Sequence, residues 1–171
     1  MRNEPLRQMY IDIKGTGSLE QEVAAFWTHL LYLYFPTDRC AIRSESKPGR
    51  GGTGRTDLLV SYFYTVGRTI VLVVENKRRE LEGQSAAWRN AVDQVTGYLL
   101  QIQEQQAKIH PSRKLHAAVA VGRYVRFYHL LPGESTLKDL PGTNQIESPY
   151  EVKDNEREVH EILCELVRTC Q

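Results

Sequence analysis

The feature that most constrains this fold is a run of five aliphatic residues, Ile70 to Val74, within the segment Thr69–Lys77. An uninterrupted apolar run of this length predicts a strand that is buried on both faces, and therefore a central place in a sheet. The run ends in Glu75-Asn76-Lys77. Because strand side chains alternate between faces, we expect Glu75 and Lys77 to share one face at the point where the buried strand stops.

A second strand, about Asp57–Tyr64, precedes this one, and Val66-Gly67 between them is typical of a turn. A hairpin centred there sets Asp57 opposite Asn76, beside Glu75 and Lys77 at a strand spacing of about 4.8 Å. Charged groups at the end of an apolar strand are costly unless they are paired or bind a metal ion. Crowded carboxylates suit Mg²⁺ or Mn²⁺. A salt bridge to Lys77 is the purely structural alternative.

The acid-x-lysine spacing is uninformative without its context, because it occurs four times. The other three examples are Asp12/Lys14, Glu45/Lys47 and Glu151/Lys153. Only Glu75/Lys77 ends a run that predicts a buried strand. The position of this pair in the sheet, rather than its spacing, makes it the candidate site.

The remaining elements follow from apolar periodicity and turn residues. We expect an irregular lead-in over residues 1–16 and a loop over Pro132–Pro149. Helices are predicted from Ser18 to before Pro36, over Ser85 to about Gln106, and around Val159–Val167; further strands are predicted over Arg39–Ser44, Leu115–Val121 and Tyr124–Leu131. The order α-β-β-β-α-β-β-α predicts one α/β domain over residues 1–171, with a mixed central sheet flanked by helices.

Composition is ordinary for a soluble globular protein, with 41% hydrophobic and 25% charged residues. The net charge of +1 predicts no strong overall attraction to nucleic acid. Basic residues nevertheless flank the candidate site: Arg43, Lys47, Arg50 and Arg55 before it, and Arg78 and Arg79 after it. A local basic rim fits a phosphate-backbone ligand.

Cysteine usage and the amino terminus favour an intracellular protein, in the cytoplasm or nucleus. The three cysteines include no CxxC, so neither a disulfide framework nor a zinc knuckle is indicated. The first residues form no apolar signal segment, and no apolar run approaches the roughly 18 residues that span a membrane. We therefore expect no membrane partner.

The element order and motifs from about Ser18 to Leu131 resemble the PD-(D/E)XK nuclease superfamily, in its branch near Holliday-junction resolvases and RecB-like nucleases. Asp57 matches the family aspartate, and Glu75-Asn76-Lys77 matches the acid-x-lysine motif. Gln94 and Tyr98 match a Gln-x-x-x-Tyr helical motif and share one helix face. Thr56 stands where the family name has proline.

The resemblance implies a restriction-endonuclease-like fold and metal-dependent cleavage of DNA. Asp57, Glu75 and the backbone carbonyl of Asn76 would ligate Mg²⁺ or Mn²⁺. Lys77 would orient or help deprotonate the attacking water. Gln94 would position the phosphate or Lys77, supported by Tyr98. Related resolvases are dimers, so a homodimer is also expected.

The family's first-helix glutamate has two candidates, Glu20 and Glu22. Glu20 lies closer to the apolar stripe at about 100° per residue and better matches a Glu-x-x-aliphatic pattern. We therefore assign Glu20, as a metal ligand through water, with Glu22 as the alternate. The functional alternative to a nuclease is a catalytically silent nuclease-like domain that binds nucleic acid or a protein.

The loop Gly49–Thr56 nearly matches a phosphate-binding P-loop. Arg55 replaces the motif's lysine, however, and a strand follows where that motif needs a helix. We instead expect Arg50 and Arg55 to contact the nucleic-acid backbone, together with Arg78 and Tyr98.

Overall fold

The structure is a computed structural model that describes residues 3–46, 56–65, 67–106, 109, 112–140 and 148–169. Within these residues the elements, in chain order, are α1 (Glu4–Lys14), α2 (Glu20–Tyr32), β1 (Cys40–Ser46), β2 (Thr56–Tyr64), β3 (Gly67–Lys77), the 3₁₀ turn η1 (Arg79–Leu81), α3 (Ser85–Gln106), β4 (Leu115–Val121), β5 (Tyr124–Leu130), β6 (Lys138–Asp139), β7 (Tyr150–Glu151) and α4 (Glu156–Arg168). No helix in these ranges has both the length and the hydrophobicity needed to cross a membrane.

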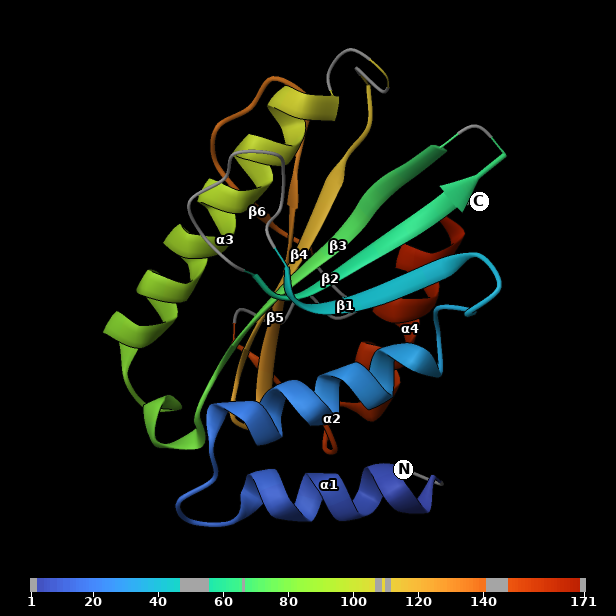
Figure 1. Cartoon of the computed structure of the whole chain (residues 1–171). Helices are drawn as coiled ribbons and strands as arrows, with labels where there is room; N and C mark the ends of the chain where they lie inside the picture. Colours follow the sequence, from blue (N-terminus) through green and yellow to red (C-terminus); the bar gives the residue numbers. More distant parts are fainter. Residues whose placement is uncertain are drawn as a thin grey trace.

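The strands form one mixed sheet of seven strands in the order β1-β2-β3-β4-β5-β6, with β7 also paired to β5 (Figure 1). β3 and β4 run parallel, and the other pairs are antiparallel. β3 is buried from Val71 to Asn76 and β4 throughout. The predicted α/β class, with a mixed sheet and a buried central strand, is therefore confirmed.

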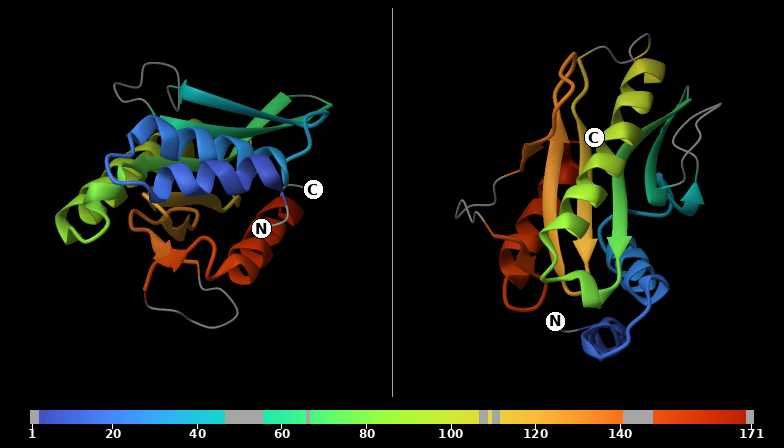
Figure 2. Two further views of the ribbon diagram at one scale, coloured as in Figure 1. Left: turned by 90° about the horizontal axis from the view of Figure 1, so that it is seen from below. Right: turned by 90° about the vertical axis from the view of Figure 1, so that its left-hand side faces the viewer.

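Helices cover both faces of the sheet (Figures 1 and 2). On one face, α3 packs over β3 and β4 through Ala91, Val95, Leu99 and Ile102. On the other face, α2 and α4 share a core with Leu58, Val60, Val74 and Ala118. α1 packs against the outer side of α2. The face covered by α3 is called the α3-side face below, because it carries the candidate site.

The predicted element order is wrong at both ends of the chain. Residues 4–14 form α1 rather than an irregular lead-in, because Leu6, Tyr10 and Ile13 make one buried stripe and Asn3 caps the helix at 3.0 Å from Leu6 N. Pro5 is compatible with this helix, since it lies in the first turn. β6 lies within the segment predicted as a loop, and β7 follows directly after it.

The predicted register of the β2–β3 hairpin is also wrong, by one residue. Tyr64 pairs with Gly67, so the turn centres one residue earlier than expected, and an irregularity at Val60/Ser61 then shifts the pairing. Leu58 pairs with Val74, which places Asp57 opposite Glu75 rather than Asn76. Directly opposed residues share a face, so the corrected register brings the two carboxylates closer together.

The end of β3 is braced by the β4–β5 turn. Gly122 N donates to the carbonyl oxygen of Lys77 at 2.9 Å, and Arg123 N donates to Glu82 Oε1 at 3.0 Å. Gly122 has a φ of 55°, and a Cβ there would lie 2.8 Å from Arg79 Cα and 2.3 Å from Glu82 Oε1. Both the left-handed backbone and the close approach require glycine at this position.

Gly122→Ala is expected to lower the free energy of unfolding by about 1–3 kcal/mol, because the methyl group forces backbone apart in a tight site. Urea denaturation measures the change. Gly97→Ala is the matched control, since a Cβ at Gly97 in α3 meets nothing within 4 Å. That control should raise stability by roughly 0.5–1 kcal/mol, because alanine is the better helix former. If Gly122→Ala is as stable as wild type, or if both variants change the free energy of unfolding by the same amount, Gly122 does not brace the end of β3.

Candidate functional site

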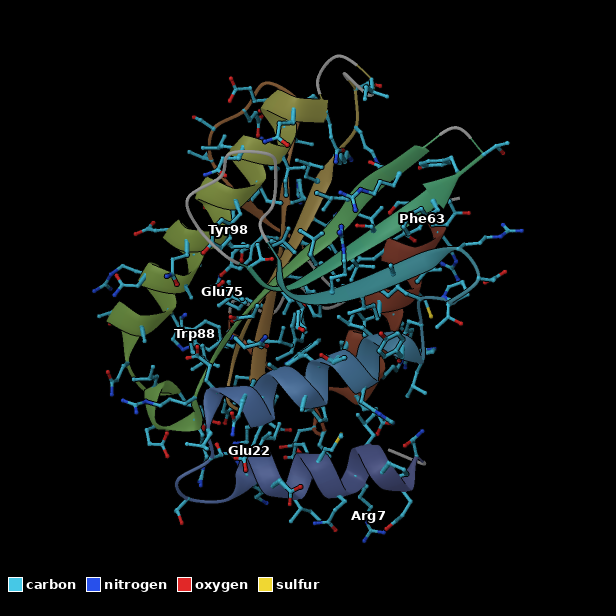
Figure 3. The ribbon with its side chains drawn as sticks, viewed as in Figure 1. Arg7, Glu22, Phe63, Glu75, Trp88 and Tyr98 are labelled. Carbon is cyan, nitrogen blue, oxygen red and sulfur yellow. The ribbon has the colours of Figure 1, made fainter. Side chains whose placement is uncertain are left out.

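Three predicted residues meet on the α3-side face where β3 leaves the sheet. Asp57 Oδ2 accepts a hydrogen bond from Asn76 N at 2.6 Å, and Lys77 Nζ lies 2.7 Å from Glu75 Oε1. Figure 3 shows Glu75 beside α3, near the labelled Tyr98. The two strands thus bring together the acid of β2 and the acid and amine of β3.

Glu75 is held in an electrostatically unfavourable place. Its residue exposure is 3%, and its Oε2 is buried without a hydrogen-bond partner in the described part of the chain. Burial, followed by the charge of Asp57, raises the pKa of Glu75 from 4.5 to about 7. Lys77 opposes this shift without cancelling it, and Glu20 adds to it. The positive charge of Lys77 therefore does not fully compensate the negative charge of the Glu75 carboxylate.

Lys77 remains an ammonium in this setting. Burial lowers its pKa, but the hydrogen bond and charge of Glu75 and the charges of Glu20 and Asp57 outweigh that effect and raise the pKa overall. One cation thus stands among three carboxylates. A net negative, partly buried cluster of this kind favours binding of a further cation.

The structure separates the two candidate glutamates of α2. Glu20 is exposed and lines a cleft of about 420 Å³ together with Asp57 and Ser44. Glu22 Oε2 instead accepts a hydrogen bond from Leu19 N at 2.8 Å, which caps the start of α2. Glu22 lies at that helix start in Figure 3. Glu20 is therefore the acid whose charge reaches Glu75, and Glu22 has a structural role.

The remaining predicted residues differ in how close they come to the cluster. Tyr98 is half-buried, and its pKa is raised first by burial and then by the charges of Glu75 and Asp57. Gln94 lies one turn earlier, is exposed, and makes no hydrogen bond or ion pair within the described residues. Arg78 is exposed directly after Lys77. Arg50 and Arg55 lie outside the described residues.

Two supporting features were missed from the sequence. The Asn76 side chain is fully buried, and neither its Oδ1 nor its Nδ2 has a partner among the described residues. Gly122 holds the carbonyl of Lys77, and Glu82 holds the next residue of that turn. The only sequence signal for the second feature is a glycine between two strands, which also fits an ordinary turn.

A metal ion at this position would have few protein ligands. Among the described residues there is no group of three or more His, Cys, Asp or Glu arranged to hold a metal ion. Mg²⁺, however, is typically bound by one or two carboxylates and keeps several waters or takes substrate phosphate oxygens. The unpartnered Oε2 of Glu75 and the crowding with Asp57 fit such a hydrated hard cation.

In comparisons with known proteins, no family model, curated protein or solved structure matches the chain.

Proposed function

We propose that this chain is a Mg²⁺- or Mn²⁺-dependent nuclease that hydrolyses DNA phosphodiester bonds. The observation that carries the proposal is Glu75, a buried acid with one oxygen on Lys77, the other without a partner, and Asp57 across from it. A purely structural salt bridge needs only one carboxylate. A second carboxylate beside the first adds repulsion and so raises the free-energy cost of burying the pair.

In this proposal Asp57, Glu75 and the backbone carbonyl of Asn76 hold the metal ion, with Glu20 acting through water. The bound ion supplies a water of lowered pKa and neutralises charge on the phosphate. Lys77 is charged and fixed by Glu75, so its Nζ can orient the attacking water or donate to a phosphate oxygen. Tyr98 supports this end of the site from α3, and Gln94 approaches only once substrate is present.

The same proposal extends to the finer fold and setting. The order α2, β1, β2, β3, α3, β4, β5, with β3 and β4 parallel, supports a restriction-endonuclease-like arrangement within the α/β class. A location in the cytoplasm or nucleus, where DNA is found, is part of the same proposal. A homodimer remains part of the proposal through the family resemblance alone.

Calorimetric titration with Mn²⁺, followed by cleavage of linear, nicked, single-stranded and branched DNA, tests the proposal. Wild type should bind Mn²⁺ and cut at least one substrate, whereas Asp57→Asn should lose both because a ligand charge is removed. Binding of DNA without Mn²⁺ binding at millimolar metal would instead support a silent nuclease-like domain. Unchanged cleavage by Asp57→Asn would overturn the site assignment.

Two matched alanine variants test the division of labour on α2. Glu20→Ala should weaken Mn²⁺ binding by about 10- to 100-fold, the usual loss for an outer ligand partner, with little change in stability. Glu22→Ala should leave Mn²⁺ binding intact and lower stability by about 0.5–2 kcal/mol, because a helix cap is lost. Calorimetry and urea denaturation on both proteins give the two readouts. The reverse pattern would make Glu22 the site residue.

A further inference from the structure

Three side chains extend the α3-side face beyond the candidate site, towards the β2–β3 turn. Arg43 pairs with Leu59, which packs under α3, and Arg68 pairs with Phe63. Tyr62 and Tyr64 share the opposite face, since their rings lie 5.0 Å apart and Tyr62 belongs to the other core. Phe63 and Arg68 therefore project on the side of Asp57 and Glu75. We call Arg43, Phe63 and Arg68 the hairpin patch.

The arginines of the hairpin patch have no carboxylate partner among the described residues. Arg43 Nη2 donates to Ser61 Oγ at 3.2 Å, but its Nε is buried and finds no hydrogen-bond partner in the part of the chain that the structure describes. Burial and then the charge of Arg68 lower the pKa of Arg43. Within the residues that the structure describes, neither arginine forms an ion pair with a carboxylate.

This lack of pairing is not general in the chain. Six other described arginines lie within 4 Å of a carboxylate oxygen: Arg7, Arg39, Arg123, Arg126, Arg157 and Arg168. Two neighbouring guanidinium groups without such partners repel each other, so an anion between them would be bound favourably. Guanidinium geometry matches phosphate in particular.

Phe63 adds an exposed ring to this basic surface. It is 46% exposed and stands opposite Arg68 in the hairpin. Figure 3 shows it far along the hairpin from Glu75. A basic surface with an exposed aromatic ring suits a single strand, because unpaired bases can stack on the ring while phosphates contact the arginines. In a duplex the base faces are already stacked and unavailable.

We infer that the hairpin patch binds an unpaired DNA strand leading away from the scissile phosphate. The inference rests on the proposed nuclease function and specifies its substrate as DNA with a single-stranded segment. Ser61, which holds Arg43, lies four residues from Asp57 along β2, and Phe63 lies six residues away. At about 3.4 Å per residue these positions are roughly 14 Å and 20 Å from Asp57. The patch therefore contacts nucleotides several positions from the cut.

Salt-dependent binding of a fluorescein-labelled 20-nucleotide single strand, measured in EDTA, tests the arginines. For Arg43→Gln/Arg68→Gln the slope of log K against log[salt] should fall in magnitude by about 1.4, since each phosphate contact on a single strand contributes about 0.7. Arg7→Gln/Arg168→Gln removes the same charge from two exposed ion pairs elsewhere and should leave the slope unchanged. An unchanged slope in the first double variant, or an equal change in both, overturns the inference.

Phe63→Ala tests the stacking component. Single-strand affinity should fall roughly 5- to 100-fold, as expected for one stacked base, while affinity for a 20-base-pair duplex stays constant. Tyr32→Ala, which removes an aromatic ring of the same 46% exposure from α2, should have no effect. Equal loss on single strand and duplex would overturn the single-strand assignment.

Binding in EDTA separates this inference from the proposed nuclease function. Loss of binding in the patch variants of a protein that cuts no DNA would reject the nuclease and retain the patch. Metal-dependent cleavage by wild type, together with unchanged single-strand binding in the patch variants, would support the nuclease and reject the patch. Circular dichroism of each variant checks that it is folded.

Discussion

Lys77→Ala is expected to reduce metal-dependent DNA cleavage by about 10²- to 10⁴-fold, the usual contribution of a positioned proton-transfer group. The variant removes the only described cation that contacts Glu75, so the attacking water loses its orienting donor. Mn²⁺ affinity should not fall, because the three nearby carboxylates remain and lose a competing positive charge. Single-turnover cleavage and Mn²⁺ calorimetry on the same preparation measure the two quantities.

Lys153→Ala is the matched control, because Glu151-Val152-Lys153 repeats the same spacing. Lys153 is exposed, with its Nζ 5.9 Å from the centre of the Tyr10 ring. Its removal should leave cleavage unchanged. If Lys77→Ala cuts DNA as fast as wild type does, or loses Mn²⁺ binding together with cleavage, Lys77 is not the residue that positions the water.

These two acid-x-lysine pairs also mark what the sequence can and cannot predict. The aliphatic run before Glu75 correctly predicted a buried central strand. Burial alone does not separate the pairs, however, because Glu151 is 6% exposed. Glu151 is satisfied by Tyr10 Oη at 2.5 Å and by the backbone N–H groups of Lys153 and Asp154. Those partners come from distant elements or local turn geometry, which the spacing does not encode.

The register of Asp57 shows a second limit. The sequence predicted two adjacent strands, but their turn centres one residue earlier than expected, and an irregularity at Val60/Ser61 then shifts the pairing back by one residue. A bulge of this kind depends on how the sheet twists against its neighbours and leaves no clear mark in composition. The acids still meet, because the bulge and the earlier turn partly offset each other.

The missed helix α1 has a different cause. Pro5 and Gly15 give the segment the composition of an irregular lead-in, yet they stand in the first turn and just past the end of the helix, where both residues are favoured. The stripe of Leu6, Tyr10 and Ile13 was present in the sequence. Its partner surface on α2 is a tertiary feature, so the short stripe alone did not indicate what it packs against.

Glu75→Gln is expected to abolish cleavage and yet stabilise the metal-free protein at pH 8 by up to about 3 kcal/mol. Folding raises the pKa of Glu75 from 4.5 to about 7. The stabilising contribution of this acid is therefore complete below pH 4.5 and is lost as pH rises through 7. At about 1.4 kcal/mol per pH unit, that interval corresponds to on the order of 3 kcal/mol. Glutamine stays neutral and still offers an oxygen to Lys77.

Urea denaturation in EDTA at pH 4.5 and pH 8 measures this effect. The variant and wild type should be nearly equal at pH 4.5 and should diverge at pH 8, and Mn²⁺ should then stabilise wild type alone. Glu151→Gln is the control of opposite sign, since its carboxylate accepts three hydrogen bonds and its loss should cost about 1–3 kcal/mol. Destabilisation by Glu75→Gln at pH 8 would identify Glu75 and Lys77 as a structural ion pair, because removing one charge of a net stabilising pair leaves the other charge buried without its partner.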